Sequence, residues 1–307
     1  MWWMAWALAQ DRGARADDAA FPDEVAAPPP RDRLWYTNAT FIRVNPLGLV
    51  DIHKVGWRRR LSTKPGILFA DTWLFTGVTA LVTPAYSRLG VFAEAQPLAV
   101  LRAFAEVTGT GYYGTFDQVL TFDDPTARYS DQTLNDRSAE ARPAYGWTAT
   151  FGVTLQAKVG PIAARSTPQV TRIDLALGEP GLYFYDQYWD RLAPDGGWMV
   201  LNDLDVLFVQ GKMRTGLRHT FSDTLDGRRD GSDSALSHHR LGPLFAWQFS
   251  DRPPGKRFNQ PTLFVVAQWW LQHPYRAGEE QPQGLPLFAA GFAFNGDHRT
   301  SAVPAVD

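Results

Sequence analysis

The chain lacks cysteine altogether and has no long apolar run. Because its 307 residues include no Cys, a disulfide framework, a zinc ribbon and a cysteine nucleophile are all excluded. No apolar stretch reaches the roughly 18 residues that a membrane-spanning helix needs, which argues against a helical membrane protein. The formal net charge is only −2, from 30 Lys and Arg against 32 Asp and Glu, whereas nucleic-acid binders normally carry a basic excess.

Aromatic residues, by contrast, are abundant. The sequence has 12 Trp, 10 Tyr and 19 Phe, so 13% of it is aromatic, although its mean hydropathy is −0.26. This apolar content is too high for a disordered chain, and the length suits one large domain or two small ones. An aromatic chain that is polar on average is typical of a large β-sandwich or of a β-barrel in a membrane.

The N-terminal segments indicate export. Residues 1–9 are apolar and end in Ala7-Leu8-Ala9, as a signal peptide does at its cleavage site. An alternative is a short apolar segment that packs on the domain. Residues 10–33 are charged and rich in Ala and Pro, which predicts a disordered periplasmic tether. We therefore expect a signal-peptide remnant, this tether, a β-barrel over 34–294 and a tail over 295–307.

From residue 34 onward the sequence alternates. Between 147 and 158 the odd positions are Trp, Ala, Phe, Val, Leu and Ala, and the even positions are mostly Thr, Gln and Lys. Successive side chains of a strand point to opposite faces, so one face is apolar and the other polar. The runs 198–209, 212–221, 240–249 and 262–273 repeat the pattern. They exceed the usual strand of about 5–6 residues and suit a tilted membrane strand of about 9–11.

The connections distinguish a barrel from a sandwich. The predicted strands are 39–46, 49–61, 66–82, 86–95, 98–112, 144–158, 160–177, 196–209, 212–222, 238–250, 262–273 and 284–294. The long connections are 113–143, 178–195, 223–237 and 274–283, and all follow odd-numbered strands. Long loops at one end, short turns at the other and an even strand count are typical of outer-membrane barrels. The sequence thus predicts an all-β, antiparallel, up-and-down transmembrane β-barrel of about 12 strands in the cell outer membrane.

The last predicted strand strengthens this interpretation. Phe288, Phe292 and Phe294 share one face, which resembles the C-terminal assembly signal of Gram-negative outer-membrane β-barrel proteins. The resemblance covers 34–294 as porin-like architecture. It implies outer-membrane lipid, lipopolysaccharide and the barrel-assembly machinery as partners, with further envelope proteins as possible ones. Aromatics near the predicted strand ends suit the headgroup level; they are Trp73, Tyr112, Tyr113, Tyr145, Trp147, Tyr183, Tyr185, Tyr188, Trp189, Trp198 and Tyr275.

If the apolar face meets lipid, the polar face lines the lumen. The expected lining includes nine basic and five acidic residues, among them Arg172 and Asp174. The residues that we expect to bind solute there are Arg88, Arg102, Lys212, Arg214, Arg218, Arg240, Asp203 and Asp205. Two interpretations stay open: a constriction that favours small anionic solutes, and a structural ion-pair network that closes the barrel. The loop 113–143 is long enough to plug the lumen or to meet outside partners.

The function predicted from these patterns is not enzymatic. We expect a monomeric barrel, without a cofactor, that forms a narrow channel for small polar or anionic solutes or serves as the barrel of a cell-envelope complex. A soluble secreted β-sandwich that binds carbohydrate is one alternative.

A lipid-active enzyme is the other alternative. Ser237 and His239 are two residues apart, and His219 on the paired strand shares their face. This arrangement resembles that of outer-membrane phospholipase A, also a twelve-stranded barrel, and a His beside a Ser can act as a general base. The nearby loop offers carboxylates of the kind that bind Ca²⁺, although a solvated loop is the favoured explanation because their spacing matches no calcium-binding motif; they are Asp223, Asp226, Asp230 and Asp233.

Overall fold

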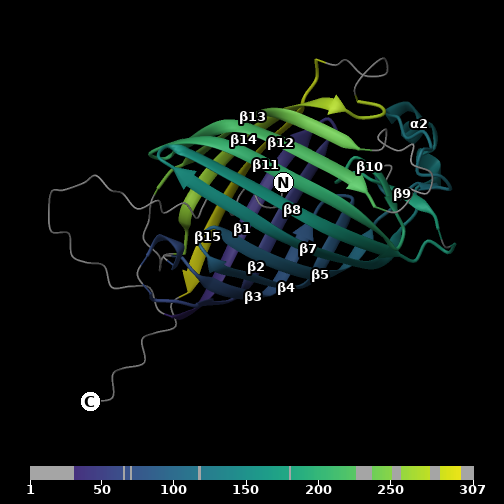
Figure 1. Cartoon of the computed structure of the whole chain (residues 1–307). Helices are drawn as coiled ribbons and strands as arrows, with labels where there is room; N and C mark the ends of the chain where they lie inside the picture. The colour runs from purple at the N-terminus through teal and green to yellow at the C-terminus, as the bar shows by residue number, and fades with distance from the viewer. Residues whose placement is uncertain are drawn as a thin grey trace.

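A computed structural model describes residues 31–298, except 65, 70, 117–118, 180, 226–236, 251–256 and 277–283. Its main body is one closed barrel of antiparallel strands (Figure 1). Each strand pairs with the barrel strand before it and the one after it, and the last pairs with the first. The strands are β1 (Asp32–Val44), β2 (Gly48–Arg60), β3 (Trp73–Val82), β4 (Tyr86–Leu98), β5 (Leu101–Tyr112), β7 (Ala144–Val159), β8 (Ile162–Leu175), β11 (Gly197–Gln210), β12 (Met213–Thr224), β13 (His238–Gln248), β14 (Asn259–Gln272) and β15 (Leu287–His298).

The predicted fold class is confirmed, because each of the twelve predicted strands overlaps one strand of the barrel. The predicted strand 66–82 begins too early, since residues 67–69 form a 3-10 helix and the strand starts at Trp73. The barrel extends beyond its predicted limits at both ends: β1 begins at Asp32 and β15 ends at His298. Residues 1–30 and 299–307 lie outside the described residues. The predicted signal-peptide remnant, most of the predicted tether and the end of the predicted tail therefore stay predictions.

Buried and exposed side chains alternate along each strand, which shows which of them face the lumen and which face outward. On β7, Trp147 and Leu155 are 39% and 54% exposed, whereas Thr148 and Thr154 are buried. On β13 and β14, Trp247 and Trp269 also face outward, at 40% and 41% exposure. A sandwich would bury such residues between two sheets, so the sandwich alternative is wrong. The closed barrel instead presents an apolar outer surface, as a bilayer requires.

A small cap covers one end of the barrel, which we call the loop end because the long connections 113–143 and 178–195 gather there (Figure 1). The cap contains a separate sheet and short helices: β6 (Thr121–Phe122), β9 (Tyr183–Asp186), β10 (Arg191–Pro194), α2 (Asp131–Asp136) and η2 (Ser138–Glu140). The side chains that form its own apolar core are Leu120, Phe122, Tyr129, Leu134, Tyr185 and Leu192.

The opposite end, the turn end, has shorter links and carries η1 (Ile67–Phe69). Here the guanidinium of Arg58 lies 4.8 Å from the ring centre of Trp35 and 4.5 Å from that of Trp73. All three side chains are buried inside the barrel, so the structure corrects the predicted rim position of Trp73. Among the described residues, no helix is long and apolar enough to cross a membrane.

Three further aromatics predicted for the rim are also buried. Tyr112 faces the lumen, and Tyr185 and Trp189 belong to the cap. Tyr113, Tyr145 and Trp147 are exposed, as a position at the headgroup level requires. Buried aromatics and exposed rim aromatics both lie near strand ends, so position along the chain alone does not distinguish the two groups.

Candidate functional site: the lumen and its cap

The tip of the β9–β10 hairpin enters the barrel. Arg43 of β1 donates from Nη1 to the carbonyl oxygen of Tyr188 over 2.8 Å, and its Nη2 donates to the carbonyl of Gln187. On the facing wall, Asp186 accepts a hydrogen bond of 3.0 Å from the Tyr112 hydroxyl and one of 3.4 Å from Arg88. The hairpin thus contacts wall strands that are not neighbours in the barrel, and its tip occupies part of the lumen at the loop end.

The far side of the tip is fastened through Asp190. Arg276, just after β14, donates from Nε to Asp190 Oδ2 over 2.5 Å and from Nη2 to Oδ1 over 3.1 Å. His273 Nδ1 accepts the backbone N–H groups of Tyr275 and Arg276, so its proton sits on Nε2, 3.1 Å from the Asp190 carbonyl oxygen. Burial alone would raise the pKa of Asp190, but the charge of Arg276 and the His273 hydrogen bond hold that pKa well below its ordinary value.

The rest of the cap lies behind this contact. Arg276 also donates to both carboxylate oxygens of Asp131, over 2.9 and 3.1 Å, which ties α2 to the same arginine. The hydroxyl of Tyr185 donates to Asp190 over 2.8 Å. The loop 113–143 therefore forms the outer layer of the cap, and the hairpin within 178–195 supplies the plug.

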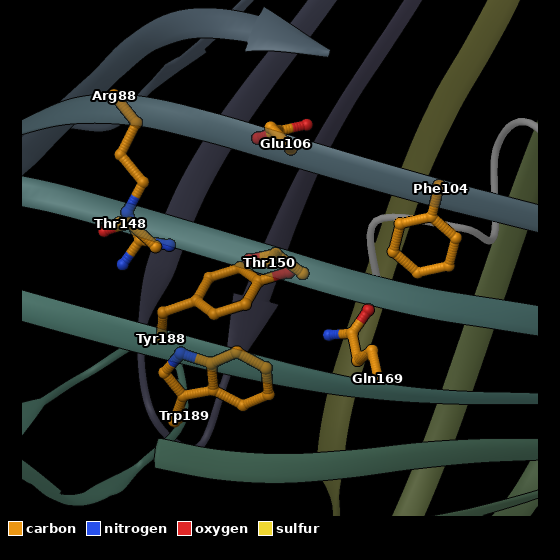
Figure 2. A pocket seen from close by; sticks show the side chains of 8 residues that line it. All are labelled: Arg88, Phe104, Glu106, Thr148, Thr150, Gln169, Tyr188 and Trp189. Atoms are coloured by element: carbon orange, nitrogen blue, oxygen red, sulfur yellow. The ribbon is translucent and has the colours of Figure 1, made fainter. Parts of the chain in front are cut away.

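A pocket lies beneath the tip (Figure 2). The empty space there is about 420 Å³, a volume that includes open solvent at its mouth. The lining comes from the hairpin and from the inner wall of β4, β5, β7 and β8: Arg88, Phe104, Glu106, Thr148, Thr150, Gln169, Tyr188 and Trp189. Two buried N–H donors of this lining, Arg88 Nε and Trp189 Nε1, have no hydrogen-bond partner. The pocket therefore offers donors to a polar solute, and aromatic rings to its apolar parts.

Ion pairs fill much of the lumen nearby. Asp205 of β11 accepts two hydrogen bonds from Arg218 of β12, of 2.6 and 2.8 Å, and one from Arg165 of β8. Asp203 lies 3.6 Å from Arg218 and accepts a hydrogen bond of 2.6 Å from Thr220. All of these side chains are buried, so paired charges take the place that water occupies in a wide pore.

A second group of charges lies on β2, β4 and β5. Lys54 Nζ is 2.7 Å from Glu94 and 3.1 Å from Glu106, and it sits 4.7 Å from the ring centre of Phe92. The Lys54 ammonium group thus forms ion pairs with two carboxylates, and one of them, Glu106, is also part of the pocket wall.

Most of the predicted lumen residues lie where the sequence places them. Their side chains are buried or half-buried on the inner wall: Arg88, Arg102, Arg214, Arg218, Arg240, Asp203 and Asp205. Lys212 is the exception, since it lies in the exposed turn before β12 and donates to the carbonyl of Phe249. Its position beyond the end of the strand removes it from the lumen wall.

Two other charged residues were assigned to the wrong face. On β8 the buried residues are at odd positions, such as Arg165 and Thr167. Arg172 and Asp174 therefore face outward, where their side chains lie 3.7 Å apart and Arg172 sits over Trp147. The sequence over 160–177 has apolar and polar residues on both faces, which left its inward face ambiguous. Lys54, Arg58 and Arg165 also line the lumen, although they were not predicted to do so. The only feature of the sequence that could have identified them is their odd or even position within a strand.

The suggested catalytic group is only partly assembled. His219 Nε2 lies 3.2 Å from His239 Nδ1 on the shared outer face. The sequence-based pairing of these two residues is wrong by two positions, because His219 lies opposite Leu241 and His239 opposite Phe221. Ser237 precedes the start of β13, is buried, and donates to Asp223 over 3.1 Å. The serine hydroxyl is thus directed to a carboxylate and not to the histidine pair, so the arrangement lacks the Ser–His contact that acyl transfer needs.

The suggested calcium loop is described only at its start. Asp226, Asp230 and Asp233 lie outside the described residues. Asp223 is buried and is held by Ser237, by the Thr224 backbone N–H and by Arg191 at 3.8 Å. Within the described ranges, no group of three or more His, Cys, Asp or Glu residues could hold a metal ion.

Comparisons with known proteins give no family for the chain. No family model and no curated protein matches its sequence. Among solved structures, the translocator domain of autotransporter NalP from Neisseria meningitidis is similar over 87% of both chains, with 10% identity and a TM-score of 0.38. OccD3 from Pseudomonas aeruginosa is similar over 87% of this chain and 92% of its own, with 12% identity and a TM-score of 0.29.

OmpF from Salmonella typhi is similar over 87% of this chain and 97% of its own, with 7% identity and a TM-score of 0.34. Identities and scores this low transfer no function. The chain's own closed sheet of twelve antiparallel strands, apolar outside and charged inside, makes it an outer-membrane-type β-barrel.

Proposed function

We propose that this protein is an outer-membrane channel for small polar or anionic solutes, closed at its loop end by the β9–β10 hairpin and opened when the hairpin tip withdraws. The observation that carries the proposal is the hairpin tip inside a lumen with excess positive charge. The basic wall residues are Arg33, Arg43, Lys54, Arg58, Arg60, Arg88, Arg102, Arg165, Arg214, Arg218 and Arg240, and the acidic ones are Glu94, Glu106, Asp203, Asp205 and Asp297.

The hairpin can leave without opening the barrel sheet. Strand β9 pairs with β10 on one side and with β6 on the other, and none of the three belongs to the barrel. The chain on either side of the hairpin passes through Gly181 and Gly196, whose φ angles are +82° and +69°. Glycine adopts such angles readily and often serves at hinges. The tip is held mainly by side-chain hydrogen bonds, which a conformational change can break without unfolding the wall.

Excess positive charge in the wall predicts selectivity. A solute that passes the plug meets Arg43 and Arg88 beside the hairpin tip, and the other wall charges lie farther along the lumen. Rings of charged side chains in a narrow pore select the opposite charge. Anions should therefore pass more readily than cations once the tip is displaced.

Planar-bilayer conductance tests this proposal. We expect low conductance from the native barrel, and at least several-fold higher, anion-selective conductance when residues 183–194 are replaced by a short Gly-Ser linker. Replacing Arg137 and Glu140, an exposed pair on the cap surface, is the matched control and should leave conductance unchanged. If the hairpin-free barrel conducts no more than the native one, the channel proposal fails. The alternative, the barrel component of a cell-envelope complex, would then be favoured.

A further inference from the structure

Two histidines that the proposed channel does not use meet on the outer face of the wall. His219 of β12 and His239 of β13 are half-buried, and the inward neighbours of His219, Arg218 and Thr220, are buried. His219 Nε2 lies 3.2 Å from His239 Nδ1, and the two ring centres are 5.4 Å apart with the ring planes tilted by 33°. One ring nitrogen of each histidine therefore faces a ring nitrogen of the other.

The pairing of β12 with β13 explains this contact. His219 lies opposite Leu241, and His239 lies opposite Phe221, so the two histidines occupy diagonal positions on the same face of the two strands. Aromatic and long side chains in diagonal positions of neighbouring strands are within reach of each other. Because both strands belong to the closed barrel, the backbone holds the two rings in place before any ligand arrives.

The distance between the two nitrogens suits a shared metal ion. Zinc binds imidazole nitrogen at about 2.0–2.1 Å, so two such nitrogens on one tetrahedral ion are about 3.3–3.4 Å apart. In adjacent positions of an octahedral ion, the same bond lengths give about 2.8–3.0 Å. The observed 3.2 Å lies between these values, so the rings need only a small adjustment to bind one ion together.

The histidine pair lies next to the loop-end edge of the wall. His239 is the second residue of β13, and the pairing of β12 with β13 extends only one position farther, to Ser222 and His238. On the turn-end side, Leu217 is 53% exposed and belongs to the apolar outer surface. The two imidazoles therefore stand at the border between this surface and the loops, where an ion dissolved in water can reach them.

We propose that His219 and His239 form a binding site for one divalent transition-metal ion of the Zn²⁺, Ni²⁺ and Cu²⁺ group. Imidazole suits these ions, whereas Ca²⁺ and Mg²⁺ bind carboxylate and carbonyl oxygen. In the metal-bound site, each neutral ring carries its proton on the nitrogen that faces away, His219 Nδ1 and His239 Nε2. The site is on the outside of the barrel, so it does not depend on the proposed channel.

Two protein ligands make an open and exchangeable site. Structural zinc sites have four protein ligands, and catalytic sites usually have three with a further position for water. Among the residues that the structure describes, no group of three or more His, Cys, Asp or Glu residues surrounds a common point, so water fills the other positions around the ion here. The barrel should therefore fold without the metal and bind it reversibly.

Calorimetric titration of the folded, untagged full chain with Zn²⁺ tests the site. We expect uptake of one ion per chain, and loss of this uptake in both His219→Gln and His239→Gln, because one imidazole alone does not chelate. His53→Gln is the matched control: His53 also faces outward, but its ring contacts Asp51, so uptake should be unchanged. Heat-modifiable gel mobility verifies that each variant is folded. A native protein that takes up no zinc, or uptake that survives both substitutions, would overturn the proposal.

Electron paramagnetic resonance of bound Cu²⁺ provides a second test, in lipid bilayers. Coupling of the copper electron to its ligand nitrogens counts the imidazoles, so one equivalent of Cu²⁺ should show two nitrogens in the native protein and at most one in His219→Gln or His239→Gln. A two-nitrogen signal that is unchanged in either variant would place the ion elsewhere and contradict the assignment. Failure of the native protein to bind Cu²⁺ in a bilayer would show that lipid covers the pair, and would also overturn the proposal.

Discussion

Arg276 and Asp190 are 86 residues apart in the chain, yet two hydrogen bonds of 2.5 and 3.1 Å join the guanidinium of one to the carboxylate of the other. Arg276 follows a barrel strand, and Asp190 is at the tip of the inserted hairpin. Both are buried. This contact fastens the plug to the wall, so it is the point at which closure of the lumen can be tested with a single substitution.

Replacing Arg276 with Met should weaken closure. The change leaves the buried carboxylate of Asp190 without its cation, and breaking a buried ion pair in this way costs about 3–5 kcal/mol. Withdrawal of the hairpin relieves part of this free-energy cost, and only that part shifts the equilibrium toward the open state. We expect the open probability in planar bilayers to rise by at least tenfold. Arg137→Met, which removes an exposed ion pair of the cap, is the control. Equal open probabilities for the native protein and Arg276→Met would show that this contact does not hold the plug.

Acid should release the plug through Asp190. Its pKa is lowered in the docked hairpin, so the stabilisation is complete above the ordinary aspartate pKa of about 3.9. It is lost as the pH falls through the lower, docked value. Conductance attributable to Asp190 should therefore stay constant from pH 7 to about pH 4 and rise only in stronger acid.

The variant Asp190→Asn supplies the control for this pH dependence. It lacks the titrating carboxylate, so its conductance should be raised at pH 7 and should show no further rise below pH 4. A native transition centred near pH 6 would contradict the assignment to Asp190.

The ion pair between Arg218 and Asp205 should stabilise the barrel cooperatively. Each leucine substitution leaves a buried charge with fewer partners and should lower the free energy of unfolding by about 3–5 kcal/mol. The double leucine variant should lose less than the sum, by a coupling of about 0.5–3 kcal/mol. Urea midpoints, read from the gel mobility of folded and unfolded forms, measure all four proteins. Strict additivity would mean that the two side chains act independently.

The Ser237 and His239 group should not hydrolyse lipid. The Ser237 hydroxyl donates to Asp223 and not to a histidine, so the histidine general base that the enzymatic interpretation needs is not in place. We expect fatty-acid release from phospholipid vesicles to equal the vesicle blank, with or without Ca²⁺. Release by the native protein that disappears in both Ser237→Ala and His239→Ala would restore the enzymatic interpretation.

Local alternation predicted much of the wall. The strict pattern over 147–158 placed Trp147 outward and Thr148 inward, and both are confirmed. The same logic found Asp203, Asp205 and Arg218. It failed for Arg172 and Asp174 and overlooked Arg165, because β8 has mixed polarity on both faces and a shift of one residue reverses every side chain.

The sequence by itself determined the barrel: the number of strands, their order and, for most of them, the face that meets lipid. These properties follow from a two-residue period and from loop lengths, which are local. Only the tertiary structure decided that the hairpin within 178–195 enters the lumen, that Arg276 holds Asp190, and that Lys54 serves both Glu94 and Glu106. Such contacts join residues from separate strands, and closure of the sheet, which no local pattern specifies, brings them together.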